Sequence, residues 1–213
     1  MPESRDNLKQ KRIRNFFLSF DAACTEENVQ EKAEKEGLTY IQMKLPVEKI
    51  TEEFENEIKK KVEKSFLGAK IREAKEEDLE TVMNIHNRAW MTANEPFRPI
   101  ELESLKKIHE YPETEILIAK VYGNDGGFII LDREGENNEI GVIAGLGVLP
   151  NLQRKGLGTV LGMSAWNYFK KKDVTELRCE VYKDNSVSYG FIKSLGFEEY
   201  DKKTYTKDDF LLD

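Results

Sequence analysis

The sequence has few cysteines, few histidines and no long apolar run, and each shortage excludes a class of protein. Only two cysteines, Cys24 and Cys179, and two histidines occur among 213 residues, and the two cysteines match no metal-binding spacing. No apolar segment approaches the roughly 20 residues that a membrane-spanning helix requires. Residues 1–11 are almost wholly polar, unlike a secretion signal. We therefore expect a cytoplasmic protein with reduced cysteines, no metal and no membrane partner.

Positive charge is also scarce. The chain has 33 Lys and Arg residues against 40 Asp and Glu residues, which gives a formal net charge of -7. A protein that binds the nucleic-acid backbone needs a broad basic surface, so we expect no nucleic-acid partner. One basic run, at residues 9–14, is local, and we interpret it as the solvated start of a strand.

The apolar pattern divides the chain into two parts. Residues 1–66 have the pattern β-α-β-α, with strands expected at residues 13–20 and 38–45 and a long helix from residue 46 to residue 66. Such a module is small for independent stability. Residues 67–213 follow the order β-α-α-β-β-β-α-β-α-β. That order predicts a mixed sheet with helices on its faces.

The larger part places its strands and helices at definite positions. Strands are expected at residues 69–74, 116–122, 128–131, 140–148, 177–181 and 197–205. Two of these strands, at residues 116–122 and 128–131, are expected to pair across a glycine-rich turn at residues 123–127. Helices are expected after Asp78, from Ile100, after Gly158 and from Asn185.

The segment at residues 147–162 is the strongest functional signal. An apolar, strand-like run passes through a basic turn and becomes helical at once. Gly156 and Gly158 let backbone N–H groups approach a phosphate, the free amides at a helix start add partial positive charge, and Arg154 and Lys155 add full charges. The spacing differs from the dinucleotide-binding G-x-G-x-x-G motif and from a P-loop. We therefore expect a phosphorylated ligand at this turn.

Three motifs carry a resemblance to a known family. The first is Gln153-Arg-Lys-Gly-Leu-Gly158, and the second is Leu177-Arg-Cys-Glu-Val-Tyr-Lys-Asp-Asn185, a strand that closes on an asparagine. The third is Phe191-Ile-Lys-Ser-Leu-Gly-Phe197, the end of a helix. In this order and spacing they resemble the GNAT superfamily of acetyl-CoA-dependent N-acetyltransferases over about residues 69–206. Residues 185–205 are also similar to the C-terminal half of mycothiol synthase-type enzymes.

The resemblance implies a fold, a reaction and a cofactor site. The fold would be α+β, a mixed, mostly antiparallel central sheet with helices on both faces. The enzyme would move an acetyl group from the thioester of acetyl-CoA to a primary amine by direct attack, without a metal. In such enzymes the strand ending at Val148 carries a bulge and splays from the strand at residues 177–181, and the pantetheine arm lies in the gap. Leu146 and Val148 would pair with that arm, and Asn185 would bond it near the thiol. The pyrophosphate would lie on the turn formed by Gln153, Arg154, Lys155, Gly156, Leu157, Gly158 and Thr159.

The catalytic groups depart from the family pattern. Many members have a Tyr, which protonates the leaving thiolate, where this chain has Ile192. Tyr189, three residues earlier, is the candidate substitute, with packing as the alternative role. The strand at residues 142–148 lacks the carboxylate that many members use as a base. Glu180 on the neighbouring strand is the candidate base, with structural hydrogen bonding as the alternative. His86 is interpreted as a packed core residue.

Two alternatives stay open. Residues 1–66, outside the resemblance, form either a degenerate second half-domain or an unrelated extension that packs on the sheet or mediates a homodimer; residues 67–213 form the acetyltransferase domain. The runner-up function is a catalytically silent acyl-CoA-binding sensor or scaffold of the same fold, motivated by Ile192 and the carboxylate-free strand. The acceptor, a small-molecule or protein amine, depends on loops such as residues 92–99, whose chemistry varies too much to decode.

Overall fold

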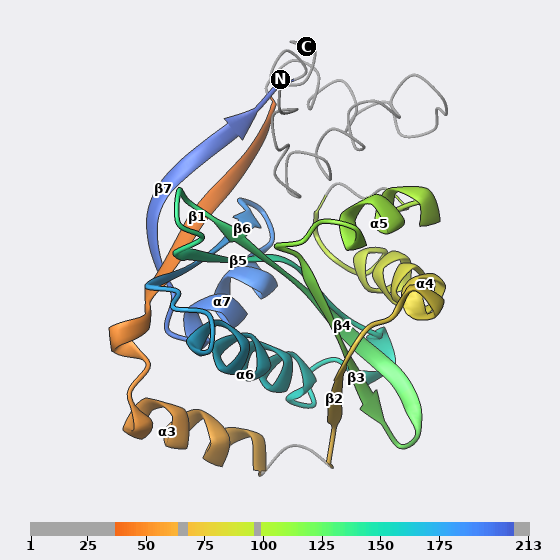
Figure 1. Cartoon of the computed structure of the whole chain (residues 1–213), viewed down its shortest axis with the longest axis horizontal. Helices are drawn as coiled ribbons and strands as arrows, with labels where there is room; N and C mark the ends of the chain where they lie inside the picture. The colour runs from red at the N-terminus through yellow and green to blue at the C-terminus, as the bar shows by residue number, and fades with distance from the viewer. Residues whose placement is uncertain (1–36, 64–67, 96–98, 207–213) are drawn as a thin grey trace.

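The central feature is one seven-stranded sheet with helices on both faces. A computed structural model describes residues 37–63, 68–95 and 99–206 (Figure 1). The strand order is β2-β3-β4-β5-β6-β1-β7, and every neighbouring pair is antiparallel except β5 and β6. This confirms the predicted α+β architecture. The strands are β1 (Leu38–Pro46), β2 (Lys70–Glu73), β3 (Glu115–Val121), β4 (Asn124–Glu134), β5 (Ile140–Val148), β6 (Glu176–Tyr182) and β7 (Glu198–Tyr205).

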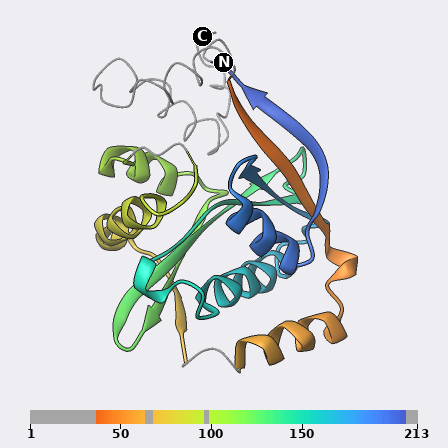
Figure 2. The same cartoon turned by 180° about the vertical axis from the view of Figure 1, so that it is seen from behind.

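The helices form two layers, one on each face of the sheet (Figures 1 and 2). One layer contains α3 (Glu52–Glu63), α6 (Leu157–Lys170) and α7 (Ser186–Ser194), and the other contains α4 (Leu79–Trp90) and α5 (Leu102–His109). Trp166 and Phe197 are 1 % exposed in the core under the first layer, and Phe128 is fully buried under the second. We call these the α6 core and the α4 core. The middle strands are therefore apolar on both faces, which explains their continuous apolar sequence.

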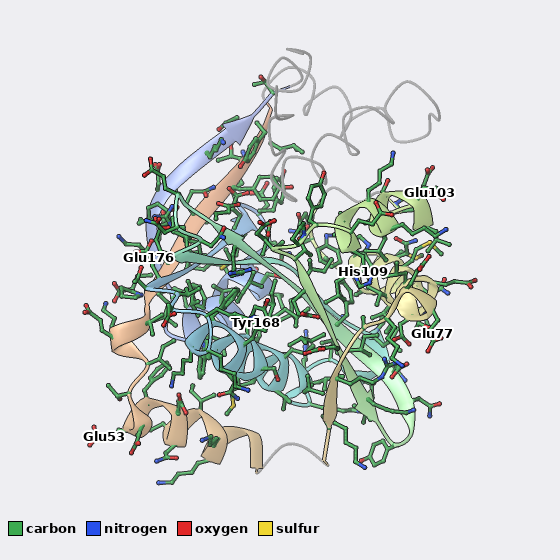
Figure 3. All side chains as sticks on the ribbon, in the orientation of Figure 1. Glu53, Glu77, Glu103, His109, Tyr168 and Glu176 are labelled. Carbon is green, nitrogen blue, oxygen red and sulfur yellow. The ribbon has the colours of Figure 1, made fainter. Side chains whose placement is uncertain are left out.

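The surface outside these cores carries exposed acidic side chains on separate helical segments. Glu53 on α3 and Glu103 on α5 are exposed, as is Glu77 in the short 3₁₀ turn η3 (Glu76–Asp78), and all three project outward (Figure 3). Like charges spread over separate helices agree with the net charge of -7.

Strand β1 comes from the part of the chain that the sequence assigns to the N-terminal extension. It lies between β6 and β7 and is antiparallel to both, with Tyr40 opposite Tyr182 and Leu38 opposite Tyr205. Met43, fully buried, faces the α6 core. Because β1 supplies the hydrogen-bond partners for one edge of each neighbour, the sheet is continuous only when β1 is present. The domain boundary at residue 66 stays a prediction, but the sheet crosses it. The strand expected at residues 13–20 lies outside the described residues.

The predicted helix from residue 46 to residue 66 is wrong at its start. Residues Val47–Lys49 form a 3₁₀ turn, η2, and α3 begins only at Glu52. Ile50 lies between them with φ -85° and ψ 70°, outside the helical region, and is 6 % exposed. Thr51 Oγ1 accepts a hydrogen bond from Phe54 N at 3.2 Å and so caps α3. The break lets Ile50 enter the core, and residues 64–66 of the predicted helix lie outside the described ranges.

The turn between β3 and β4 is tighter than the predicted turn at residues 123–127. Tyr122 and Gly123 have φ of 50° and 84°, so they form a two-residue hairpin turn with both positions left-handed. Gly126 and Gly127 therefore belong to β4. A Cβ added at Gly127 would lie 3.1 Å from Leu161 Cδ1, which shows that these glycines allow α6 to approach the sheet closely.

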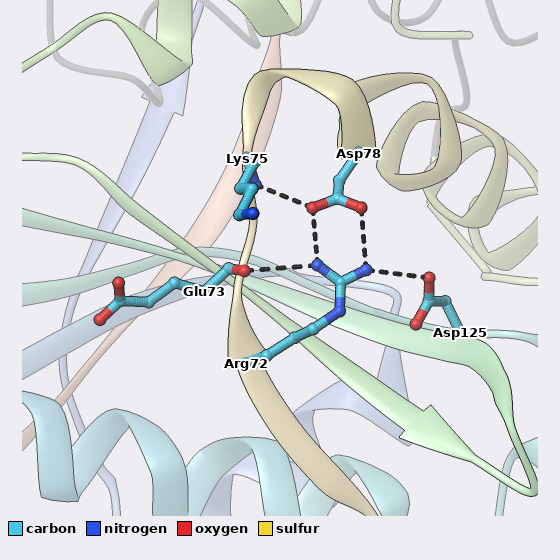
Figure 4. Close-up of polar contacts among 5 residues, drawn as sticks. All are labelled: Arg72, Glu73, Lys75, Asp78 and Asp125. Atoms are coloured by element: carbon cyan, nitrogen blue, oxygen red, sulfur yellow. Dashed lines mark hydrogen bonds and ion pairs between the residues drawn. The ribbon is translucent and has the colours of Figure 1, made fainter.

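An ion-pair network ties β2 to the start of α4 and to β4 (Figure 4). Arg72 donates to both carboxylate oxygens of Asp78, at 2.6 and 2.8 Å, and to Asp125 at 3.1 Å. Asp78 also accepts from Lys75 N at 2.8 Å. The hydrogen bonds from Arg72, above all, lower the pKa of Asp78 from 3.8 to about 2. The network therefore holds the start of α4 against strands β2 and β4.

Candidate active site

Strands β5 and β6 separate after a short parallel ladder. They pair only from Ile140 opposite Glu176 to Ile143 opposite Cys179. The β4–β5 register shifts at the same level, which leaves Ala144 as an extra residue on β5. Such a β-bulge bends a strand and disrupts its pairing. The bulge and the splay that the resemblance implied are therefore both present.

The backbone of β5 points towards this gap at the two residues named for the cofactor arm. Leu149 N donates to Gly126 O at 2.9 Å, which sets the phase of the antiparallel ladder. Residues alternate along such a ladder, so Gly147 is in a hydrogen-bonded pair with β4. Leu146 and Val148 consequently turn their N–H and C=O groups away from β4, towards the gap, where they can bind an amide-containing ligand.

The turn after β5 exposes the amides at the start of α6. Arg154 and Gly156 have left-handed φ values of 59° and 83°. Gly156 is the N-cap of α6 and no side chain caps the helix. The N–H groups of Leu157, Gly158 and Thr159 therefore begin the helix in the arrangement that binds anions. Exposed Arg154 and Lys155 stand beside them. The turn therefore has the features of an anion-binding site.

The side chain of Gln153 joins this turn to two other elements. Its Nε2 donates to Val148 O at 3.0 Å and to Thr92 Oγ1 at 3.4 Å. The first bond closes the end of β5 against the turn. The second reaches the segment after α4, on the other side of the sheet.

Asn185 stands at the open end of β6 and is 3 % exposed. Its Oδ1 accepts from Ser188 N at 3.1 Å and caps α7, as the sequence predicted. The cap uses only the oxygen, so the amide nitrogen is the group that can donate to a ligand in the gap. Phe191 on α7 reaches Gly158, where an added Cβ would lie 3.1 Å from its ring. Helix α7 is thus packed directly against the start of α6.

The two candidate catalytic residues lie on opposite faces of the sheet. Tyr189 packs against the α6 core, and its hydroxyl donates to Glu199 Oε2 on β7 at 3.3 Å. Glu180 has the opposite orientation, because its neighbours Cys179 and Val181 face the α6 core. Glu180 Oε1 accepts a hydrogen bond from Tyr205 at 2.9 Å. The structure does not bring Tyr189 and Glu180 together.

The face of β6 that carries Glu180 holds residues that the sequence did not single out. Tyr40 from β1 and Tyr182 from β6 are opposite each other, with ring centroids 5.6 Å apart. Tyr40 donates to Glu95 Oε1 at 3.1 Å. Burial, with a smaller contribution from nearby Asp184, raises the pKa of Tyr182. The apolar pattern around Tyr40 and Ile41 predicted a strand, but it could not show which strands would lie beside β1.

Residues 92–95 cross from one side of the gap to the other. Thr92 accepts from Gln153 in the turn after β5, and Asn94 Nδ2 donates to Asp184 O beyond β6 at 2.7 Å. Glu95 accepts from Tyr40 on β1. This part of the loop, which was expected to help bind the acceptor, therefore contacts the turn after β5, the segment after β6 and strand β1. Residues 96–98 of the loop lie outside the described ranges.

The two glycines of β5 differ in their surroundings. A Cβ at Gly147 would lie 2.5 Å from Phe128 Cε1, whereas one at Gly145 would meet nothing closer than 3.8 Å. Gly147 is needed for packing, and Gly145 leaves space on the same face. His86 stacks on Trp90 with ring centroids 4.3 Å apart and is 6 % exposed, as expected for a core residue.

Neither a membrane-spanning helix nor a metal cluster occurs in the described ranges. No helix there is both long and apolar enough to cross a bilayer. No group of three or more His, Cys, Asp or Glu side chains there could hold a metal ion.

Comparison with known proteins identifies the family. The model of the acetyltransferase (GNAT) family matches residues 79–197. The chain is 26 % identical over 144 residues to an aminoglycoside N(6')-acetyltransferase type 1 of Acinetobacter haemolyticus, covering 63 % of this chain and 94 % of that protein. It is 34 % identical over 65 residues to a mycothiol acetyltransferase of Renibacterium salmoninarum, covering 30 % of this chain and 19 % of that protein.

A solved structure supports the fold. The PaiA N-acetyltransferase of Thermoplasma acidophilum, crystallised with coenzyme A, superposes with a TM-score of 0.53 at 24 % identity, over 65 % of this chain and all of that chain. The family match covers more than half of the sequence, from the start of α4 to Phe197, and includes all three motifs. The chain therefore belongs to the GNAT family of acetyltransferases.

Proposed function

We propose that this acetyltransferase uses acetyl-CoA to acetylate a primary amine of a small molecule by direct attack. The observation that carries the proposal is the gap between β5 and β6, with an anion-binding helix start at one end and a carboxylate, Glu180, on the acceptor face. Acetyl-CoA supplies an acetyl group that is already activated as a thioester. The protein has to orient the two reactants and move protons.

The cofactor residues have distinct roles in this proposal. The N–H groups from Leu157 to Thr159 and the charges of Arg154 and Lys155 hold the pyrophosphate. Leu146 and Val148 bind the amides of the pantetheine arm through their backbone. The side-chain nitrogen of Asn185 donates near the thiol end.

Proton transfer is assigned to two residues. Glu180 takes the proton that the amine nitrogen loses as its lone pair forms the new C–N bond. Tyr189 is the proposed proton donor to the leaving sulfur, and its hydroxyl would exchange its bond to Glu199 for one in the gap. Because the two side chains lie on opposite faces of the sheet, the amine and the cofactor would approach from opposite sides.

The name of the Acinetobacter relative supports a small molecule with amino groups, such as an aminoglycoside, as the acceptor. Release of CoA measured against a panel of amines, with calorimetry for the cofactor, tests the proposal. We expect saturable acetyl-CoA binding and turnover that Glu180→Gln reduces at least about tenfold. No binding of CoA or acetyl-CoA at millimolar concentration would refute it.

A specific observation keeps one alternative, a silent acyl-CoA-binding sensor. Ile192 occupies the position of the usual acid, and the Tyr189 hydroxyl bonds Glu199. This alternative predicts cofactor binding without transfer to any amine. The variant Tyr189→Phe tests the role of Tyr189. A large loss of turnover would identify Tyr189 as the proton donor, whereas full activity would show that Tyr189 only packs against the core.

A further inference from the structure

Glu180 accepts a hydrogen bond from one tyrosine, and a second tyrosine packs against the first. The Tyr205 hydroxyl on β7 donates to Glu180 Oε1 at 2.9 Å, and Tyr205 is only 3 % exposed. The ring of Tyr40, on β1, contacts the ring of Tyr205 edge-on at 5.9 Å and that of Tyr182 at 5.6 Å. A buried phenol packed against a second ring has little freedom to turn away. Tyr205 therefore presents its O–H to the carboxylate in one fixed direction.

The inserted strand makes this arrangement possible. Tyr205 is opposite Leu38 on β1, not opposite a residue of β6, so its side chain reaches Glu180 across the intervening strand. Gln42 of β1 is the direct partner of Glu180 in the ladder and is 8 % exposed. Without β1, neither the spacing between Tyr205 and Glu180 nor the Tyr40 packing would exist.

Other charged or titratable groups face this part of the sheet. On β6, Arg178 shares the face of Glu180 but donates to Glu176 at 2.7 Å, and on β7, Lys203 lies 4.5 Å from the centre of the Tyr205 ring. The further groups around the site are Glu95 after α4, Asp184 after β6, Asp201 opposite Gln42 and Tyr182 on β6. The hydroxyl of Tyr205 is in direct contact with the carboxylate of Glu180.

We propose that Tyr205 is a positioning residue for the reaction, which keeps Glu180 ionised and aimed at the acceptor amine, and that β1 belongs to the active site because Tyr40 holds Tyr205 in place. The proposal rests on the function proposed above. A hydrogen bond donated to a carboxylate favours its charged form, and the charged form is the one that can accept a proton. Residues before the family match thus contribute to catalysis without touching substrate.

The test is the pH dependence of kcat/KM in Tyr205→Phe, which removes the hydroxyl and keeps the ring. Loss of the bond makes Glu180 protonate at higher pH, so we expect the acidic limb of the profile to move up by about one pH unit. Activity well above that limb should fall much less. Tyr40→Leu, which removes the supporting ring, should move the limb in the same direction, with melting curves to confirm that each variant is folded.

Tyr200→Phe is the matched control, because Tyr200 is on the same strand but its ring contacts Lys44 and Arg178. It should leave the limb in place. An unshifted limb in Tyr205→Phe, or an equal loss at every pH, would show a structural role only and overturn the proposal.

A measurement without turnover separates this inference from the proposed function. NMR titration of ¹³C-labelled glutamate side chains, with the Glu180 signal assigned through Glu180→Gln, reports proton uptake in the free protein. If the Glu180 carboxylate takes up its proton at higher pH in Tyr205→Phe than in the wild type, the positioning role is supported even if no amine is acetylated. Turnover in the wild type without such a shift overturns the positioning role and leaves the proposed function standing.

Discussion

Gly145 and Gly147 stand two residues apart on β5 and offer a matched pair of substitutions. In Gly147→Ala the new methyl group would lie 2.5 Å from the Phe128 ring, which is fully buried and has little room to move. Overpacking of this kind costs about 1–3 kcal/mol, or a fall in Tm of roughly 2–12 °C for a protein of this size. Gly145→Ala places its methyl at an ordinary contact distance of 3.8 Å and should keep the Tm. Thermal unfolding of both variants checks this; equal Tm values would contradict it.

A substitution at Arg154 tests the proposed pyrophosphate site. The residue is exposed beside the first amides of α6, so Arg154→Glu replaces attraction to the pyrophosphate by repulsion. We expect about tenfold weaker binding of CoA by calorimetry, with a smaller difference at high salt. Lys107→Glu, an exposed residue on α5, makes the same change in net charge far from the turn and should leave the affinity unchanged.

At the scale of residues, the sequence was informative where function depends on the backbone. The glycine turn and the Asn185 cap have local signatures, because each depends on the conformation of a few consecutive residues, whereas the bulge in β5 was expected only from the family resemblance. The contacts of Glu180 and Tyr189 could not be predicted. Their partners, Tyr205 and Glu199, lie on a strand whose position in the sheet depends on the insertion of β1.

Among the elements, β2, η3 and β4 are joined by the Arg72 network, which gives the fold a dependence on acidic pH. The pKa of Asp78 is about 2 in the folded protein and 3.8 ordinarily, so the stabilisation is complete above pH 4 and is lost as the pH falls through 2. Asp78→Asn should lower the free energy of unfolding by about 1 kcal/mol at pH 6. The loss is small because the Arg72 side chain is 37 % exposed, and solvent weakens an exposed ion pair.

Denaturant unfolding of wild type and Asp78→Asn between pH 6 and pH 2 measures this contribution. The difference in free energy of unfolding between the two proteins should shrink as the pH falls through the window. A difference that stays constant would show that the ion pair contributes nothing. Glu77→Gln, at an exposed neighbouring position, is the control and should show no such convergence.

The types of the elements followed from apolar periodicity, and their limits did not. The strands at residues 140–148 and 177–181 and the helix after Gly158 were identified because periodicity and flanking turn residues agree. The helix after Pro46 begins late because Ile50 gains more by entering the core than by staying helical. The β3–β4 turn is shorter than predicted because Gly126 and Gly127 belong to β4, where they leave room for α6. In the sequence, glycines needed for such packing look the same as glycines of a turn.

For the whole molecule, the decisive question is whether the acetyltransferase part folds without β1. A chain that begins at residue 67 would lose the ladders on both sides of β1 and the side chains of Ile41, Met43 and Leu45 from the α6 core. We expect no cooperative unfolding transition and no CoA binding from it, because unpaired strand edges and a core cavity are both costly. Circular dichroism melting and calorimetry test this. A native-like transition would instead support residue 66 as an independent domain boundary.

Strand β1 also sets the order in which the molecule can be completed. Thr39 and Thr204 bond to each other across 165 residues, and β1 cannot gain its β7 partner until nearly the whole described chain has left the ribosome. Contacts of such long sequence separation slow folding, because the entropy of closing the loop is lost before the contacts form. The phenol of Tyr205 reaches Glu180 only at that last step. During synthesis, the chain would therefore complete the turn proposed to bind phosphate before Tyr205 can reach Glu180, the proposed proton acceptor.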